Sequence, residues 1–199
     1  MRNRRGMTLI EVMIVLAIVA GLIVVGAPRL FKKQNNIKAT ARQFMVLSRT
    51  VRNKARIYNS TYRIVLNIDG DNAGTYWVER ANGPIPIDPD AAEKERERQK
   101  SKFKDEDGPP PAYAIDNSVI KKEAKLPDGF RFAEVETLTS KEPLTSGTAY
   151  IHFFPEGFVE ASSIQITDGN KLTWTLVFNP LTGQADIIEK AQSLKDIKR

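Results

Sequence analysis

A long apolar run near the N-terminus constrains this 199-residue chain more than any other feature. Between Met7 and Pro28 the only charged residue is Glu11, and a short head with three arginines precedes the run. A helix needs roughly 20 predominantly apolar residues to cross a bilayer core. The run is therefore long enough to form a membrane-spanning helix.

Three interpretations of this segment compete. A secretory signal peptide has an apolar region of about 7–15 residues followed by a small-residue cleavage site, whereas this run is longer and leads into Pro28 and Arg29. A plain membrane anchor explains neither Gly6 directly before the run nor an acid inside it. A carboxylate costs roughly 2.5–3.5 kcal/mol at the centre of a spanning helix, so Glu11 is a functional candidate. A cut after Gly6 would place a new α-amine on Met7, one helical turn from Glu11.

The motif GMTLIEVMIVLAIV resembles the leader junction of type IV pilins and type II secretion pseudopilins. The resemblance implies that residues 1–6 are a leader peptide and that the prepilin peptidase cleaves between Gly6 and Met7. It also implies N-methylation of Met7, and neutralisation of a neighbouring subunit's Met7 amine by Glu11 during assembly. The protein would cross the bacterial inner membrane once through residues 7–28, with the N-terminus cytoplasmic and the remainder periplasmic.

Residues 29–60 contain no glycine, proline or acid, and large side chains recur in them every seven residues. This spacing predicts a basic amphipathic helix that packs one stripe against a flat surface. The predicted packing residues are Leu30, Ile37, Phe44, Val51 and Tyr58. Together with the apolar run, the segment would form one continuous stem helix. Gly21, Gly26 and Pro28 are expected to soften it, because proline removes a backbone hydrogen bond.

From Tyr62 onward the pattern changes from helical to alternating, and β-branched and aromatic residues become frequent. Short turns separate the predicted strands, so they should pair mainly antiparallel. The expected fold class is therefore α+β: a long N-terminal transmembrane helix packed on a mainly antiparallel sheet that forms a head from residue 61 to 199. The predicted strands are Tyr62–Ile68, Thr75–Glu79, Phe130–Glu136, Thr148–Phe154, Ser163–Thr167, Leu172–Phe178 and Ala185–Ile188.

A segment rich in proline and mixed charge, at about residues 81–117, interrupts the strands. It has few bulky apolar residues, so it cannot bury enough surface to offset the entropy lost on ordering. We expect an exposed insertion, which either is merely tolerated or serves as a docking loop for a partner.

The charge is divided unevenly along the chain. Residues 1–68 contain 13 Lys/Arg and one acid (+12), and residues 69–199 contain 17 Lys/Arg and 23 acids (−6), which together give the net +6. Phosphate neutralisation requires clustered Lys/Arg. The acidic head therefore argues against nucleic acid as a partner.

Signals for catalysis or metal binding are weak. The chain has no cysteine and a single histidine, His152, which lies in a predicted strand and is read as a structural residue. Asp69 and Asp71 flank Gly70 in a pattern that weakly resembles a calcium loop, but a turn is favoured. No nucleophile–base motif is present, so we predict no catalytic residue, no metal site, no cofactor and no enzymatic activity.

Two segments of the head, YIHFFPEGFVEASSIQITDG and NPLTGQADI, resemble the C-terminal half of the H-type minor pseudopilins. This resemblance implies a minor pseudopilin that assists filament initiation or tip assembly during protein export by type II secretion. Its partners would be the prepilin peptidase, other major and minor pseudopilins, the inner-membrane assembly platform and the lipid bilayer. The alternative is a minor pilin of a type IV pilus, with a role in adhesion, motility or DNA uptake. A simple membrane-anchored binding domain would leave Gly6 and Glu11 unexplained.

Overall fold

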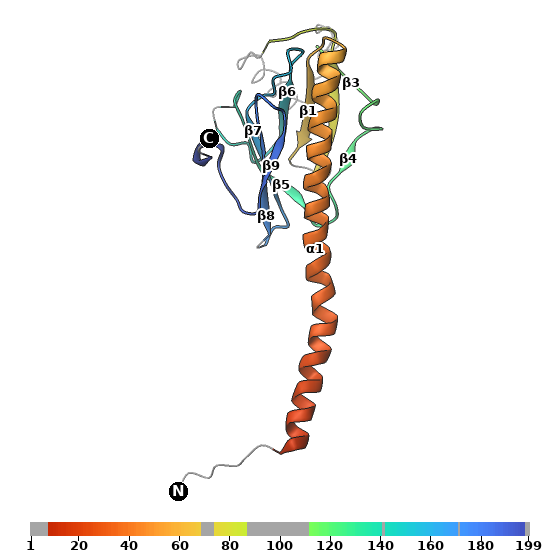
Figure 1. Cartoon of the computed structure of the whole chain (residues 1–199), viewed down its shortest axis with the longest axis vertical. Coiled ribbons are helices and arrows are strands. Elements are labelled where there is room, and N and C mark those ends of the chain that lie inside the picture. Colours follow the sequence, from red (N-terminus) through yellow and green to blue (C-terminus); the bar gives the residue numbers. More distant parts are fainter. Residues whose placement is uncertain (1–7, 69–73, 87–111, 141, 171, 198–199) are drawn as a thin grey trace. The chain divides into compact units, whose positions relative to one another are not determined.

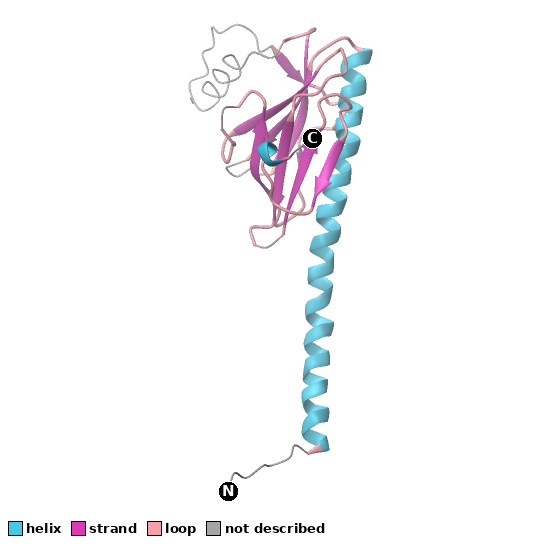
Figure 2. Cartoon of the chain, turned by 60° about the vertical axis from the view of Figure 1, so that its left-hand side comes forward, coloured by secondary structure: helices cyan, strands magenta, loops and turns pink. Residues whose placement is uncertain are grey.

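The computed structural model describes residues 8–68, 74–86, 112–140, 142–170 and 172–197, with the side chains of residues 23–35 excepted. Contacts within the chain divide it into two compact units, residues 1–38 and residues 39–199. The described elements, shown in Figures 1 and 2, are α1 (Leu9–Ile57), β1 (Tyr62–Asn67), β2 (Thr75–Ala81), β3 (Tyr113–Ile115), β4 (Ala124–Lys125), β5 (Arg131–Thr137), β6 (Thr148–Phe153), β7 (Ser162–Thr167), β8 (Thr173–Phe178), β9 (Ala185–Ile188) and the 3-10 helix η1 (Leu194–Asp196).

The first unit contains the N-terminal part of α1, whose apolar side chains are exposed. Leu9, Leu16 and Leu22 are 81%, 62% and 69% exposed. Among the residues that the structure describes, no helical stretch is both long and apolar enough to cross a membrane. The expected span, residues 7–28, lies partly outside the described part, which lacks Met7 and the side chains beyond residue 22. The transmembrane helix therefore stays a prediction.

The second unit contains two antiparallel sheets, so the expected α+β class with antiparallel strands is confirmed. The first sheet has the strand order β3-β2-β1-β6, with β4 also paired to β2, and the second has the order β5-β7-β8-β9. In the first sheet, Ile64 at the centre of β1 lies opposite Val78 of β2 and Ile151 of β6. All three side chains are fully buried, which places the centre of this sheet in the core.

An aromatic cluster joins α1 to both sheets of the second unit. The ring of Phe44, on α1, lies 4.7 Å from that of Tyr76 on β2 and 6.1 Å from that of Phe132 on β5. The Phe44–Phe132 contact is edge-to-face, a favourable geometry for aromatic pairs. Phe44 and Val51 are both fully buried. The stripe predicted from the seven-residue spacing therefore faces the core at these two positions.

Polar side chains of α1 also hold two turns of the head. Ser48 Oγ donates a hydrogen bond to the Gly183 carbonyl at 2.6 Å, and Arg52 Nε donates to the Gly157 carbonyl at 2.6 Å. Gly183 has a φ of +64°, and a Cβ there would lie 2.4 Å from Arg52 Cδ. Glycine is favoured at residue 183, because a side chain would be strained by the positive φ and would displace the Arg52 side chain.

The packing prediction fails at the end of the helix. Tyr58 is half-exposed and follows the last residue of α1, because the chain turns at Asn59, which has a φ of +45°. Its ring instead lies 4.8 Å from the Arg80 guanidinium carbon. Ile37 is fully buried, and Leu30 lies among the side chains that the structure does not describe.

The seven strands predicted from the sequence are confirmed to within two residues at each end. The short strands β3 and β4 were missed, because two or three residues are too few to show an alternating pattern. β3 falls inside the region expected to be an exposed insertion and pairs antiparallel with β2, so the C-terminal end of that region belongs to the sheet. Residues 87–111 of the insertion lie outside the described part.

Candidate functional site

The N-terminal end of α1 is the first candidate site. The Glu11 backbone N–H donates to the Thr8 carbonyl at 3.1 Å, with a longer 3.4 Å contact to Thr8 Oγ1. Thr8 and Glu11 have the Thr-x-x-Glu spacing of a capping box, in which the first side chain covers a free N–H at the helix start. Glu11 lies in the first turn of α1 and is exposed, and a negative charge there is favourable at the positive end of the helix dipole.

The geometry adds Thr8 to the residues singled out from the sequence. The spacing T-L-I-E is a sequence signal for this cap. Gly6 and Met7 themselves lie outside the described residues. α1 begins at Leu9, so the predicted cleavage position falls just before the helix.

The predicted softening residues lie within α1. The helix runs from Leu9 to Ile57 through Gly21, Gly26 and Pro28. A Cβ added at Gly21 would meet no atom within 4 Å, so packing does not require glycine there. Softening of the helix at these positions stays a prediction.

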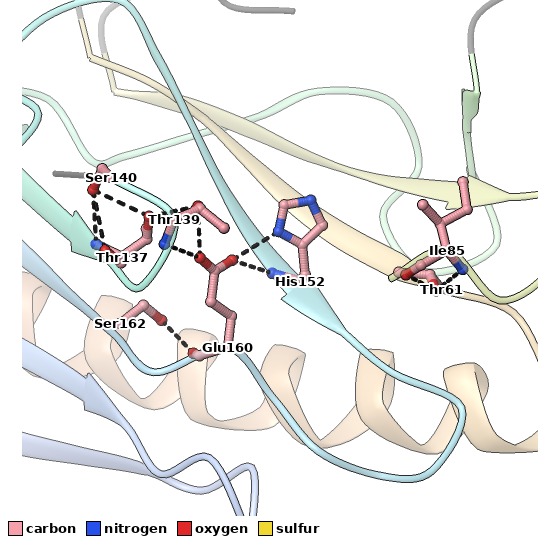
Figure 3. Close-up of polar contacts among 8 residues, drawn as sticks. All are labelled: Thr61, Ile85, Thr137, Thr139, Ser140, His152, Glu160 and Ser162. Atoms are coloured by element: carbon pink, nitrogen blue, oxygen red, sulfur yellow. Dashed lines mark hydrogen bonds and ion pairs between the residues drawn. The ribbon is translucent and has the colours of Figure 1, made fainter. Parts of the chain in front are cut away.

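A buried carboxylate in the head is the second polar centre (Figure 3). Glu160 is 1% exposed and lies between β6 and β7. Its Oε1 accepts hydrogen bonds from the backbone N–H and the hydroxyl of Thr139, at 3.0 and 2.7 Å. Its Oε2 lies 2.7 Å from His152 Nδ1 and accepts from the His152 backbone N–H at 3.2 Å. The carboxylate thus connects the turn after β5, in the second sheet, with β6 in the first.

The surroundings of Glu160 determine its protonation. Burial by itself raises the pKa of this carboxyl, but hydrogen bonds and charge from His152, together with the two hydrogen bonds from Thr139, outweigh burial and lower the pKa below its usual value. The His152 ring lies among the rings of Tyr113, Tyr150 and Phe154, with centroids 6.1–6.4 Å away. The histidine therefore lies in an aromatic pocket and contacts the carboxylate that joins the sheets. Sequence reasoning placed His152 in a strand but could not identify Thr139 or Glu160 as its partners.

A cation between aromatic rings forms a further cluster on the first sheet. The Arg63 guanidinium carbon lies 3.9 Å from the Tyr113 ring centroid and 4.2 Å from that of Tyr150. Arg63 Nε donates to Glu79 Oε2 at 2.6 Å, and Trp77 Nε1 donates to the other oxygen of Glu79 at 2.8 Å. The positive charge of Arg63 therefore contacts the Glu79 carboxylate and two aromatic rings within the sheet. These contacts link β1 to β2, β3 and β6.

Within the described part of the chain, no three His, Cys, Asp or Glu residues gather closely enough to hold a metal ion. Asp69 and Asp71, the weak calcium candidates, lie outside that part.

Comparison with known proteins gives a family-model match by sequence and three matching chains among the solved structures. Residues 1–26 match the family model described as the prokaryotic N-terminal methylation motif, so the prepilin-type signal predicted from the sequence is present. No curated protein matches the chain. Two solved structures of the minor pseudopilin EpsH from the type II secretion system of Vibrio cholerae are 12% and 11% identical, with TM-scores of 0.43 and 0.44. They cover 77% and 80% of this chain, and the chain covers 97% of each.

Proposed function

We propose that this chain is a minor pseudopilin of a type II secretion system, a structural and non-catalytic subunit that joins a short filament. The observation that carries the proposal is the N-terminal methylation motif at residues 1–26, which overlaps the start of a helix at Leu9. A cut between Gly6 and Met7 leaves a mature chain whose helix begins almost at its first residue. The antiparallel strands that follow the helix agree with a stem-and-head subunit.

Glu11 has the central role in this proposal. An acid at membrane depth must find a cation or become protonated. Cleavage creates a cation at the right depth, the amine of Met7. Within one chain, the Met7 amine is the free end of the helix that contains Glu11. The amine and the Glu11 carboxylate of the same chain are therefore poorly placed to pair. A neighbouring subunit's amine can approach from the side, so the pair would form only in the assembled filament.

Location and partners follow from the same segment. We propose that residues 7–28 cross the inner membrane once, with the leader in the cytoplasm and the head in the periplasm. The exposed leucines of the first unit are then covered by lipid and by the helices of other pseudopilins. The prepilin peptidase and the assembly platform would act on the chain before and during assembly, and the filament would support protein export.

Processing is tested by intact-mass analysis of the membrane-extracted protein. We expect loss of the first six residues and addition of a methyl group to Met7. Gly6→Val should abolish cleavage, whereas the matched control Gly21→Ala, at a glycine with open space around it, should leave cleavage unchanged. A mature chain that starts elsewhere, or an uncut wild-type chain, would contradict the proposal.

Assembly is tested separately with Glu11→Gln, which keeps the side-chain shape and removes the charge. The variant should be inserted and cleaved like the wild type but should no longer co-purify with other filament subunits or support secretion. Normal export by this variant would show that assembly does not need the negative charge of Glu11. Loss of pili or DNA uptake with unchanged secretion would assign the chain to a type IV pilus instead.

A further inference from the structure

A groove on the second unit lies between α1 and the segment that connects β3 to β4. It has a volume of about 630 Å³. Its floor and walls are largely apolar and include Val46, Leu47, Tyr76, Val119 and Ile120, and Arg42 lines it as well. In Figure 1 the green segment between β3 and β4 lies alongside α1, on the side away from β7, β8 and β9.

The groove has the dimensions and pattern that suit a helix. Its lining residues on α1 extend from Ala39 to Thr50, which is about three turns or roughly 16 Å at 1.5 Å per residue. They recur at helical spacing and form a stripe separate from the buried one that contains Phe44 and Val51. Val46, in the middle of this second stripe, is 63% exposed. An amphipathic helix docks by laying its apolar face against apolar side chains that such a groove exposes.

The wall opposite α1 is built by a local turn. The Lys122 backbone N–H donates to Asn117 Oδ1 at 3.2 Å, and Lys122 has a φ of +73°. Lys54 on α1 is hydrogen-bonded to Ser118 in the same turn. These contacts hold Val119 and Ile120 beside the helix, so the groove is a feature of the folded head.

Basic residues outnumber acids beside the groove on both of its sides. On α1, Arg42 lines the groove and Arg49, seven residues later on nearly the same face, is also exposed. In the segment that forms the other wall and in β4 beyond it, the exposed residues Lys121, Lys122 and Lys125 outnumber the two acids Asp116 and Glu123, and Asp116 accepts a hydrogen bond from the Ser118 backbone N–H. Between Glu11 and Asp69 the sequence contains no acid at all. A helix that enters an apolar groove with cationic walls is favoured when it has acidic residues beside its apolar stripe.

From this geometry we infer that the groove binds an amphipathic, acidic helix of a different filament subunit. The inference rests on the proposed function and adds the chemistry of the partner. A second copy of this chain does not fit, because Glu11 is the only acid in its own α1. The partner helix would place apolar side chains against Val46 and Ile120, and Asp or Glu residues beside Arg42 and the lysines.

The test uses the full-length chain in its native cells, with the photo-reactive residue p-benzoylphenylalanine in place of Val46. Cross-linked peptides are identified by mass spectrometry, and Leu138, which is 69% exposed on the head outside the groove, serves as the control position for the probe. We expect Val46, and not Leu138, to cross-link to a helix with Asp or Glu in another inner-membrane subunit. Arg42→Glu should reduce this product by roughly tenfold or more, because it opposes like charges. The matched control Lys190→Glu, at an exposed lysine outside the groove, should leave it unchanged.

In the Arg42→Glu background, replacing the acidic residue nearest the cross-link on the partner helix by lysine should restore the Val46 cross-linked product. Cross-links to lipid, to a second copy of this chain, to its own residues 87–111, or to no partner would overturn the inference. So would insensitivity of the cross-link to Arg42→Glu. If the mature chain starts at Met7 and the Val46 probe fails, only this inference is lost. If the chain is not processed there, the proposed function itself fails.

Discussion

The two units of this protein differ in how far their large apolar side chains are exposed to solvent. In the first unit, leucines such as Leu9 and Leu22 are more than two-thirds exposed. In the second, the side chains of Phe44, Phe132 and Phe178 are at most 1% exposed. The second unit buries these aromatic side chains within its own fold, whereas the described apolar side chains from Leu9 to Leu22 are exposed. Exposed apolar surface of this kind indicates a surface that lipid or other chains cover.

The first prediction tests the self-contained core of the head and carries the largest expected effect. Phe44→Ala should lower the free energy of unfolding by about 3–5 kcal/mol, because it removes a fully buried ring and leaves a cavity between α1 and both sheets. Denaturant unfolding of the full chain in detergent micelles, followed by tryptophan fluorescence, measures the change. Val46→Ala, on the same helix but 63% exposed, is the control and should change stability by about 0.5 kcal/mol or less. A near-zero effect of Phe44→Ala would show that the ring is not part of the head's core.

The second prediction concerns the carboxylate that joins the two sheets. Glu160→Gln should cost about 2–3 kcal/mol at neutral pH, because a neutral amide cannot replace the charged acceptor that His152 and Thr139 share. Glu156→Gln, at an exposed glutamate in the same connection, should cost about 0.5 kcal/mol or less.

The same pair of proteins tests the pH dependence. The pKa of Glu160 is lower in the folded state than its usual value of 4.5. Its contribution is therefore fully present above that value and is lost as the pH falls through the lower, folded pKa. The difference in unfolding free energy between the wild type and Glu160→Gln should shrink as the solution is acidified below about pH 4.5. A difference that stays constant down to pH 2 would contradict the lowered pKa.

The third prediction concerns the stem, where the smallest effect is expected. Thr8→Ala should destabilise the start of α1 by about 0.5 kcal/mol, because the Glu11 N–H loses the longer of its two acceptors, Thr8 Oγ1, and keeps only the Thr8 carbonyl. Hydrogen exchange should become faster at the first amides of α1, including Glu11, with no change in the unfolding of the head. Thr50→Ala is the control, since that hydroxyl donates to the Val46 carbonyl within the same helix and caps nothing. Equal exchange rates in the wild type and Thr8→Ala would show that the Thr8 side chain does not cap α1.

Local patterns predicted the elements of the head well and their contacts poorly. The long strands β1, β6 and β8 were identified because β-branched and aromatic residues are frequent over six consecutive positions. β3 and β4 were missed, because such short strands exist only through pairing with β2. The seven-residue spacing identified Phe44 and Val51 as buried but extended wrongly to Tyr58, because the helix ends one residue earlier.

The candidate sites also fall into two groups, those that a sequence motif predicts and those that only the fold brings together. Gly6, Met7 and Glu11 are neighbours in sequence, and their motif was readable without any structure. Glu160 and Thr139 are separated by 21 residues, and Lys54 and Ser118 on opposite walls of the groove by 64. No local spacing indicates such pairs, because loop closure and sheet pairing bring them together.

The sequence by itself determined the N-terminal motif, the α+β class and the uneven distribution of charge. These properties depend on residue type and on short-range periodicity, which the chain carries whether or not it is folded. Only the tertiary structure decided that a buried carboxylate joins the two sheets and that Arg63 lies between two tyrosine rings. It also decided that the basic face of α1 borders an apolar groove. Each of these depends on which distant segments come together, and that choice is made by burial of the whole core.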